Sequence, residues 1–260
     1  MRRKQSEKLT AIAAAALAVF TRDGFAAAQV ADIAREAGLS VGTLYLYADG
    51  KQALFELALR VAALEPDPGR NVDVAALPLR ARGMEATALV LDDVIGQRAR
   101  WPVLKAAVRA GAPRDVDTEI AAIVGELFDL LSGAGAVIWL FDRCAWELPW
   151  MRDIYLDRMR APYFGDLARY VKRRRKLGHF DSGKQAAAVS RAVVEMVAWM
   201  AMHHARDPGT VQFDAAAARR ACVAIACGGL LGRRLCGSDD GARRRAPSRR
   251  GRDRRAAMSA

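Results

Sequence analysis

The stretch 30–47 constrains the fold most, because it has the pattern of two short helices joined by a tight glycine turn. Apolar residues recur at helical spacing over 30–37 and again over 41–47, and Ser40 stands in the N-cap position of the second helix. Gly38 can adopt the left-handed conformation that the turn requires, and Ala34 is small enough for two helices to cross closely. The stretch therefore predicts a helix-turn-helix, whose second helix would place its outer face in the major groove of DNA.

The residues around this turn carry a more specific pattern. The run Val-Ala-Asp-Ile-Ala-Arg-Glu-Ala-Gly-Leu-Ser-Val-Gly-Thr-Leu-Tyr fills 30–45, with Gly24-Phe25 before it and Lys51 and Ala53-Leu54 after it. Over residues 9–54, about a fifth of the chain, this pattern resembles the DNA-binding domain of the tetracycline-repressor (TetR) family. The resemblance implies an all-α protein with an N-terminal three-helix helix-turn-helix domain and a larger C-terminal helical domain for ligand binding and dimerisation.

The resemblance also implies which side chains contact DNA: Gln29, Val41, Gly42, Thr43, Tyr45, Tyr47 and Lys51. Those at 41–43 would face base edges, where the Thr43 hydroxyl can bond a base and Gly42 lets the helix come close. The two tyrosines, Lys51 and Gln29 would bind phosphates, and the basic residues 2–4 would form an arm along the backbone or in a minor groove. Taken alone, the two tyrosines fit equally well as packing aromatics.

Two positions depart from the family pattern. Ala28-Gln29 replaces the usual hydroxyl residues before the second helix, so a Thr-type cap is missing, and Ala48 replaces the usual Phe, which predicts weaker packing between the third and fourth helices. These departures leave open an alternative, a helical dimer that binds a small molecule or a partner and whose helix-turn-helix is vestigial.

Most of the remaining chain also has helical periodicity. The first helix is expected to have an apolar face from Leu9 to Phe20 and to end at Gly24, and a fourth helix is expected over 51–64. A proline-rich loop should follow, and Gly133-Ala134-Gly135 is expected to kink or split one of the later helices. Those later helices are expected at 83–98, 100–110, 116–145, 149–176, 183–205 and 213–235. The domains are therefore predicted as 1–51 for the helix-turn-helix, 52–236 for the regulatory and dimerisation domain, and 237–260 for a disordered Arg-rich tail.

One helix-turn-helix reads only a few base pairs, so the expected partner is a near-palindromic double-stranded operator bound by a homodimer. Candidates for the dimer interface, with the monomer core as the alternative, are Val189, Val193, Met196, Val197, Met200, Cys222, Ile225, Ala226, Gly229 and Leu230. A small, largely apolar effector of unknown identity is expected between the C-terminal helices. Large side chains that line its cavity or belong to ordinary core are Trp101, Phe128, Trp139, Phe141, Trp146, Trp150, Met151, Tyr155 and Phe164.

The formal net charge of +12 is unevenly distributed, because ten arginines oppose three aspartates over 233–260 and account for +7 of it. The tail can add sequence-independent affinity for DNA or be inert, and the basic run 172–176 is expected to be a solvated helix end that suits the helix dipole. No uninterrupted apolar run reaches the roughly 18 residues that a membrane span needs. The basic and apolar N-terminus imitates a secretion signal, but Glu7 and Lys8 interrupt it.

No catalytic pattern appears, so the protein is not expected to be an enzyme or to need a cofactor. Four scattered cysteines suggest a reducing cytoplasm rather than a disulfide scaffold. The adjacent His203 and His204 point about 100° apart on a helix, and Cys222 and Cys227 are poorly spaced for chelation. The sequence therefore predicts neither a metal site nor a redox pair.

Overall fold

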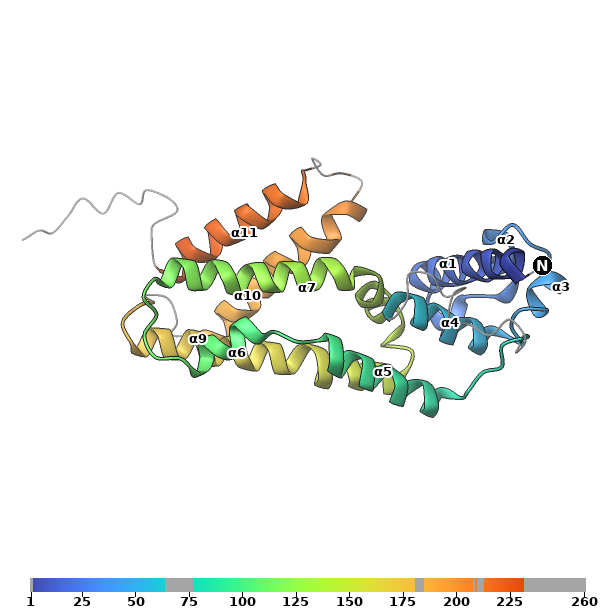
Figure 1. The fold of residues 1–260 in the computed structure, drawn as a ribbon, viewed down its shortest axis with the longest axis horizontal. Helices are drawn as coiled ribbons and strands as arrows, with labels where there is room; N and C mark the ends of the chain where they lie inside the picture. The colour runs from blue at the N-terminus through green and yellow to red at the C-terminus, as the bar shows by residue number, and fades with distance from the viewer. Residues whose placement is uncertain (1, 64–76, 181–184, 208, 210–212, 232–260) are drawn as a thin grey trace, which may run out of the picture.

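The computed structural model describes residues 2–63, 77–180, 185–207, 209 and 213–231, and within them the chain is helical without a strand. Figure 1 shows the small helix-turn-helix domain at one end, with the long helix α7 running from it through the larger domain. The predicted tail at 237–260 and most of the predicted proline-rich loop lie outside the described residues. The helices are α1 (Arg2–Ala27), α2 (Val30–Glu36), α3 (Val41–Tyr45), α4 (Lys51–Ala63), α5 (Met84–Arg98), α6 (Pro102–Arg109), α7 (Val116–Cys144), α8 (Pro149–Asp153), α9 (Ala161–Lys176), α10 (Ala186–Ala198) and α11 (Ala215–Leu230).

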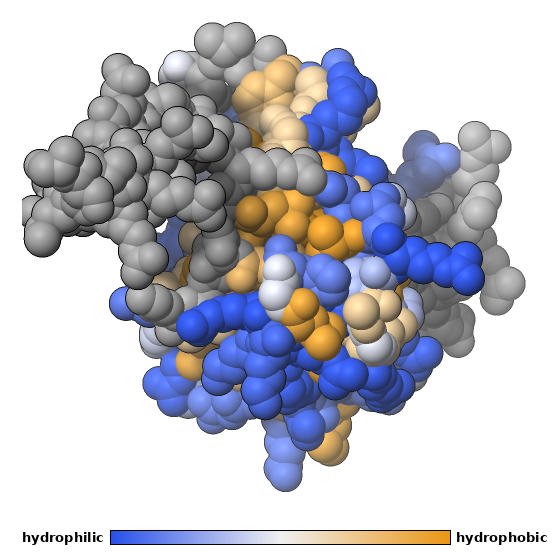
Figure 2. All heavy atoms as spheres, turned by 90° about the vertical axis from the view of Figure 1, so that its left-hand side faces the viewer, coloured by the Kyte–Doolittle hydropathy of each residue, from blue (hydrophilic) through white to orange (hydrophobic). Residues whose placement is uncertain are grey.

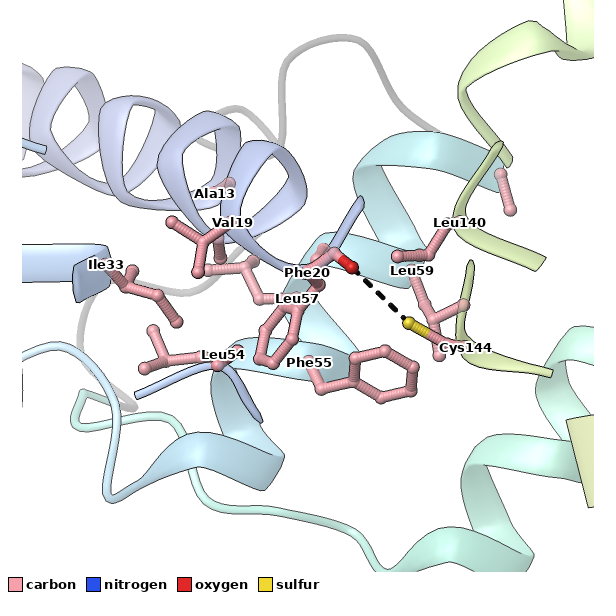
Figure 3. Packing of buried hydrophobic residues seen from close by; sticks show 14 of the residues in the cluster. Ala13, Val19, Phe20, Ile33, Leu54, Phe55, Leu57, Leu59, Leu140 and Cys144 are labelled. Atoms are coloured by element: carbon pink, nitrogen blue, oxygen red, sulfur yellow. Dashed lines mark hydrogen bonds between the residues drawn. The ribbon is translucent and has the colours of Figure 1, made fainter. Parts of the chain in front are cut away.

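The apolar face of α1 forms the core of the N-terminal domain, as its spacing predicts. Fully buried side chains recur along it at Leu9, Ile12, Ala13, Ala16 and Phe20. Figure 3 shows Ala13, Val19 and Phe20 packed against Ile33 of α2 and against side chains of α4. Because α4 buries most of its apolar residues in this same cluster, we propose that it belongs with the N-terminal domain, beyond the boundary predicted after residue 51.

The small residue Ala48 lies beside a segment that is distant in sequence. Ala48 is 1% exposed, and its backbone forms an isolated parallel bridge with Leu79. Asp49 N donates to Leu79 O at 3.0 Å, and Leu79 N donates to Tyr47 O at 2.8 Å. Leu77 and Leu79 pack against the N-terminal cluster, so a segment distant in sequence supplies apolar contacts at this edge of the domain.

Helix α7 belongs to two hydrophobic clusters. Its first half, including Ile120 and Phe128, packs with α6, α9, α10 and α11, whereas its second half, including Val137 and Leu140, packs with α1 and α4. Figure 3 shows Leu140 and Cys144 reaching the N-terminal core, where Cys144 Sγ donates to Phe20 O at 3.5 Å. The expected kink or split at 133–135 does not occur, because α7 is continuous through these residues.

The basic run at the end of α9 is only partly the solvated helix end that its composition predicts. Arg174 is fully buried, and its Nε and Nη2 donate to the Glu119 carboxylate at 2.6 and 2.7 Å. Tyr170 Oη donates to the same carboxylate at 2.9 Å, and Arg174 Nη2 also reaches Ala107 O at 2.9 Å. Hydrogen bonds to a carboxylate and a carbonyl through Nε and Nη2 offset part of the cost of desolvating this guanidinium. The structure therefore corrects the prediction at Arg174, which ties α9 to α6 and α7.

The C-terminal end of α7 holds the C-terminal end of α1. Gly24 interrupts α1 with φ 84° and ψ 175°, which leaves the last carbonyls of the preceding turn without helical partners. Arg143 donates to Asp23 O at 2.5 Å and to Arg22 O at 3.3 Å, and Glu147 accepts from Ala26 N at 2.7 Å. A positively charged guanidinium that binds the carbonyls at the end of a helix is electrostatically favourable. A negatively charged carboxylate that binds the amide after the break is favourable for the same reason. We call Arg143 and Glu147 the α7 clamp.

Two helices are long and apolar enough, by length and composition, to cross a membrane: Lys4–Ala27 within α1, and α7. The sequence analysis counted only uninterrupted apolar runs, so it did not identify these two helices. In the structure α1 and α7 pack against each other and bury their apolar faces in protein. A core helix meets the same test, so these two helices are weak evidence for a membrane span.

Replacing Gly24 by Ala should destabilise the protein, because these dihedral angles are almost restricted to glycine and the new methyl group would lie 2.9 Å from Arg143 Cζ. We expect a loss of roughly 1–3 kcal/mol in the free energy of unfolding, measured by urea denaturation. The matched control is Gly133→Ala in α7, where the methyl group meets open space. That variant should gain about 0.5–1 kcal/mol, and equal losses in both variants would contradict this explanation.

Candidate nucleic-acid interface and effector cavity

The turn between α2 and α3 has the geometry that a helix-turn-helix requires. Gly38 has φ 67°, and Ala34 is buried where the two helices cross. Ser40 caps α3, because its side chain accepts a hydrogen bond from Thr43 N at 3.1 Å. Leu44 is fully buried and fixes α3 on the domain core, which leaves the opposite face of this short helix exposed.

Most of the predicted DNA-contacting residues lie on this exposed face. Val41 is 40% exposed and Tyr45 is 47% exposed, while Gly42 is exposed and a methyl group placed on it would meet nothing within 4 Å. Thr43 is half-buried, with its Oγ1 2.8 Å from Ser40 Oγ. Gln29 is exposed in the N-cap position of α2 and makes no side-chain cap bond, as the missing hydroxyl residue predicts.

Tyr47 and Lys51 are placed differently from the other predicted contacts. Tyr47 is only 6% exposed and belongs to the hydrophobic cluster, so packing accounts for most of its ring. Lys51 Nζ donates to Ala26 O at 2.9 Å and lies 4.9 Å from the centroid of the Phe25 ring. Lys51 is the first residue of α4, and these contacts hold its side chain beside the end of α1.

The predicted N-terminal arm is helical. Residues 2–4 form the first turn of α1 rather than an extended segment. Arg and Lys are good helix formers, and the helix continues without interruption into the buried face that begins at Leu9. An arm lying in the minor groove would require this turn to unwind, so the structure does not favour it.

A cavity of about 540 Å³ lies between helices of the larger domain and the end of α4, within the size range of small-molecule sites. Its walls come from α4, α5, α7, α9 and α10 and are mainly apolar. Among the apolar residues that line it are Ala62, Ala63, Ile95, Leu127, Ala134, Val137, Ile138, Met159, Val194 and Met202. Gly133 and Ala134 lie between the two halves of α7, so small residues at the centre of this helix leave room for the cavity.

Three of the nine large side chains proposed from sequence line this cavity: Trp101, Tyr155 and Phe164. The others lie elsewhere, since Phe128, Phe141 and Met151 are buried core, Trp146 is 71% exposed, and Trp139 and Trp150 are half-buried away from it. Periodicity cannot distinguish a side chain that packs against protein from one that faces a void. Which of these residues line the cavity therefore depends on the tertiary arrangement of the helices.

Sequence reasoning missed the polar wall of the cavity. Tyr155 Oη donates to Asp142 at 2.5 Å and accepts from Arg160 Nη1 at 3.2 Å. Arg160 Nη2 donates to Glu195 Oε1 at 2.9 Å, and Arg191 Nε lies 2.6 Å from the same oxygen. These residues are spread over 142–195, and nothing in their local sequence links them.

Two π-helical segments flank this cavity, Ile154–Arg160 and Trp199–His203. The first contributes Tyr155 and Arg160 to the wall, and the second contributes His203. A π-helical turn is rare and occurs frequently at functional sites. Their position supports the cavity as a functional site.

The predicted dimer stripe divides into buried and exposed parts. Val197, Cys222, Ala226 and Leu230 belong to the core of one chain, which fits the alternative interpretation for these four residues. The remaining stripe residues on α10 are half-buried, while Ile225 is 48% exposed and Gly229 is exposed. Figure 2 shows the end of the molecule that lies away from the helix-turn-helix. Apolar residues gather in the upper part of this view, on the side where Figure 1 places α11.

In the described ranges, no group of three or more His, Cys, Asp or Glu side chains could hold a metal ion. His203 lines the cavity, whereas His204 stacks on Phe213 with 4.4 Å between ring centroids. Cys222 is buried, Cys227 Sγ donates to Asp117 O at 3.9 Å, and neither forms a disulfide within the described residues.

Three buried tyrosines of the larger domain, two of which line the cavity, should resist ionisation in the native protein. Burial raises the pKa of Tyr155, Tyr163 and Tyr170, and nearby carboxylates raise each pKa further. Because the native state retains these protons more strongly than the unfolded chain, their contribution to stability falls as pH rises above about 10. Alkaline titration of tyrosinate absorbance should show these phenols ionising together with unfolding. Gradual ionisation of all five tyrosines in the folded state would contradict this assignment.

Residues 12–58 match the family model described as bacterial regulatory proteins of the tetR family. No curated protein matched the chain. Among solved structures, the fatty acid degradation regulator FadR from Bacillus halodurans is 16% identical, with 86% of this chain and 96% of that chain covered and a TM-score of 0.44. FadR from Bacillus subtilis in complex with stearoyl-CoA is also 16% identical, with 85% and 98% covered and a TM-score of 0.43.

The family match spans α2 and α3 and most of the two helices that support them. It therefore coincides with the turn at Gly38, the capped α3 and the exposed face described above. The N-terminal domain therefore matches the tetR family of bacterial regulatory proteins over residues 12–58.

Proposed function

We propose that the protein is a dimeric, cytoplasmic repressor that binds a near-palindromic DNA operator and is released from it by a small, largely apolar effector. The observation that carries the proposal is the exposed face of α3, held by the Ser40 cap and the buried Leu44 in a domain that matches the family. A protruding helix with Val41, Gly42 and Thr43 at its start fits the major groove.

The proposed division of contacts follows from exposure and chemistry. Thr43 and the neighbouring Val41 and Gly42 would contact base edges, while Tyr45, Lys51 and Gln29 would contact phosphates. Tyr47 would reach a phosphate only through the small exposed part of its ring. Lys51 would combine its charge with the N-terminus of α4, where backbone N–H groups favour an anion.

The effector would act through the walls of its cavity. Ala62 and Ala63 at the end of α4 line the cavity, and so does the second half of α7. Both helices pack against α1, so a ligand that prefers one arrangement of these walls would shift the position of the DNA-binding head. Release requires that the effector bind the non-DNA-binding arrangement more tightly.

The test is selection from randomised duplex DNA by the full-length protein at two salt concentrations. A near-palindromic site with two half-sites is expected. On that site Thr43→Ala should lose roughly 1–3 kcal/mol of discrimination at one or two base positions, whereas Lys51→Met should weaken binding to all sequences and reduce the salt slope by about one. Lys105→Met on α6 is the matched control and should change neither. Selection that recovers no sequence would favour the vestigial helix-turn-helix instead.

A charge placed on the exposed part of α11 should disrupt the proposed dimer. Ile225→Arg puts a guanidinium where a second copy would bury an apolar side chain, so sedimentation equilibrium should report a monomer with unchanged helical content. Leu177→Arg, a similarly exposed position at the end of α9, is the control and should leave the dimer intact. An unchanged dimer in the Ile225 variant would place the interface elsewhere.

A further inference from the structure

Two arginines share one carboxylate oxygen on the polar wall of the cavity. Arg160 Nη2 and Arg191 Nε lie 2.9 and 2.6 Å from Glu195 Oε1. Both guanidiniums also lie against Phe164, with 5.7 and 5.3 Å from each Cζ to the ring centroid. Arg160 is the less exposed of the pair, at 29% of its side chain against 59% for Arg191.

Arg160, Arg191 and Glu195 together carry one positive charge in excess, because two guanidiniums share one carboxylate. Asp142 is the other nearby carboxylate, and Arg160 is joined to it through the Tyr155 hydroxyl. Asp129, a third carboxylate of the lining, pairs with Arg219 at 3.3 Å. Within the described part of the chain, Arg191 makes its one ion pair through Nε, so its two Nη groups can still donate.

We infer that the effector is an amphipathic anion, with an apolar body in the cavity and a carboxylate on the Arg160–Arg191 pair. The inference rests on the proposed effector site and adds the chemical class of its ligand. A guanidinium offers two parallel N–H donors to a carboxylate, and an apolar surrounding strengthens such charge-assisted bonds. The cavity lining also contains Ile95, Val137 and Ile138, which suit a hydrocarbon chain.

Because the two arginines lie on different elements, a carboxylate that binds both would affect how these elements are joined. Arg160 ends the π-helical segment Ile154–Arg160, and Arg191 belongs to α10. Glu195, also on α10, joins the two elements through its bond to Arg160. A ligand carboxylate that binds both guanidiniums would compete with Glu195, and would therefore change the bond between this segment and α10.

The experiment compares three probes with the same twelve-carbon tail, each below its micelle concentration: dodecanoate, dodecanol and dodecyltrimethylammonium. Binding to the full-length protein is measured by titration calorimetry. Dodecanoate should bind at least roughly tenfold more tightly than dodecanol, and the cationic probe should bind more weakly than either. Ala134→Phe, which fills the cavity, should abolish binding of all three probes.

The arginines are tested by Arg160→Gln and Arg191→Gln. Each should reduce the affinity for dodecanoate roughly tenfold and leave dodecanol nearly unchanged, which removes the preference for the anion. Arg152→Gln, on α8 and outside the cavity lining, is the matched control and should preserve that preference. Should Arg160→Gln fail to fold, the more exposed Arg191→Gln carries the test.

Equal affinities for the three probes, a preference for the cation, or an undiminished preference in both arginine variants would overturn the inference. If a palindromic DNA site were recovered together with any of these results, only the inference of an anionic head group would be wrong, and the proposed function would stand. If dodecanoate binding depended on both arginines but no sequence-specific DNA binding were found, the ligand class would be supported and the proposed repressor function would be wrong.

Discussion

Helix α7 is the element on which the rest of the structure depends, because one continuous helix contributes to both hydrophobic clusters. Its first half packs in the larger domain and its second half packs against α1 and α4. From Gly133 at the cavity to Arg143 of the clamp the chain advances 10 residues, or about 15 Å at helical rise, all of it within α7. A continuous helix is stiff over this length, so the cavity wall and the clamp move together.

The cavity exists because the packing of α7 changes at its centre. Gly133 and Ala134 have little volume to fill the space between the two clusters, and both π-helical segments contribute residues to the cavity lining. Side chains that face a void lose dispersion contacts, which a ligand body can restore. An apolar effector would therefore gain affinity from surfaces that are underpacked in its absence.

The sequence predicted what depends on local pattern and missed what depends on distant partners. Helical periodicity, Gly38 and Ser40 were sufficient for the helix-turn-helix, and the later helix bounds agree closely with those expected. The burial of Arg174 was not predicted, because one arginine in a basic run has no local feature that distinguishes it. The contact between Arg143 and Asp23 joins residues 120 apart, and the Arg160–Glu195 pair joins residues 35 apart. Such pairings follow from tertiary packing, which periodicity does not describe.

The end of α1 is the place where the two proposed sites meet. Ala26 donates through its N–H to Glu147 of the α7 clamp and accepts through its carbonyl from Lys51, the proposed phosphate contact. A displacement of α7 would therefore act on the same peptide segment that positions Lys51 at the start of α4. Because coupling between two binding sites is reciprocal, a phosphate that draws Lys51 away from Ala26 would in turn alter the segment on which the clamp acts. The short segment 22–26 thus provides a direct physical connection between the DNA-binding face and the helix that lines the cavity.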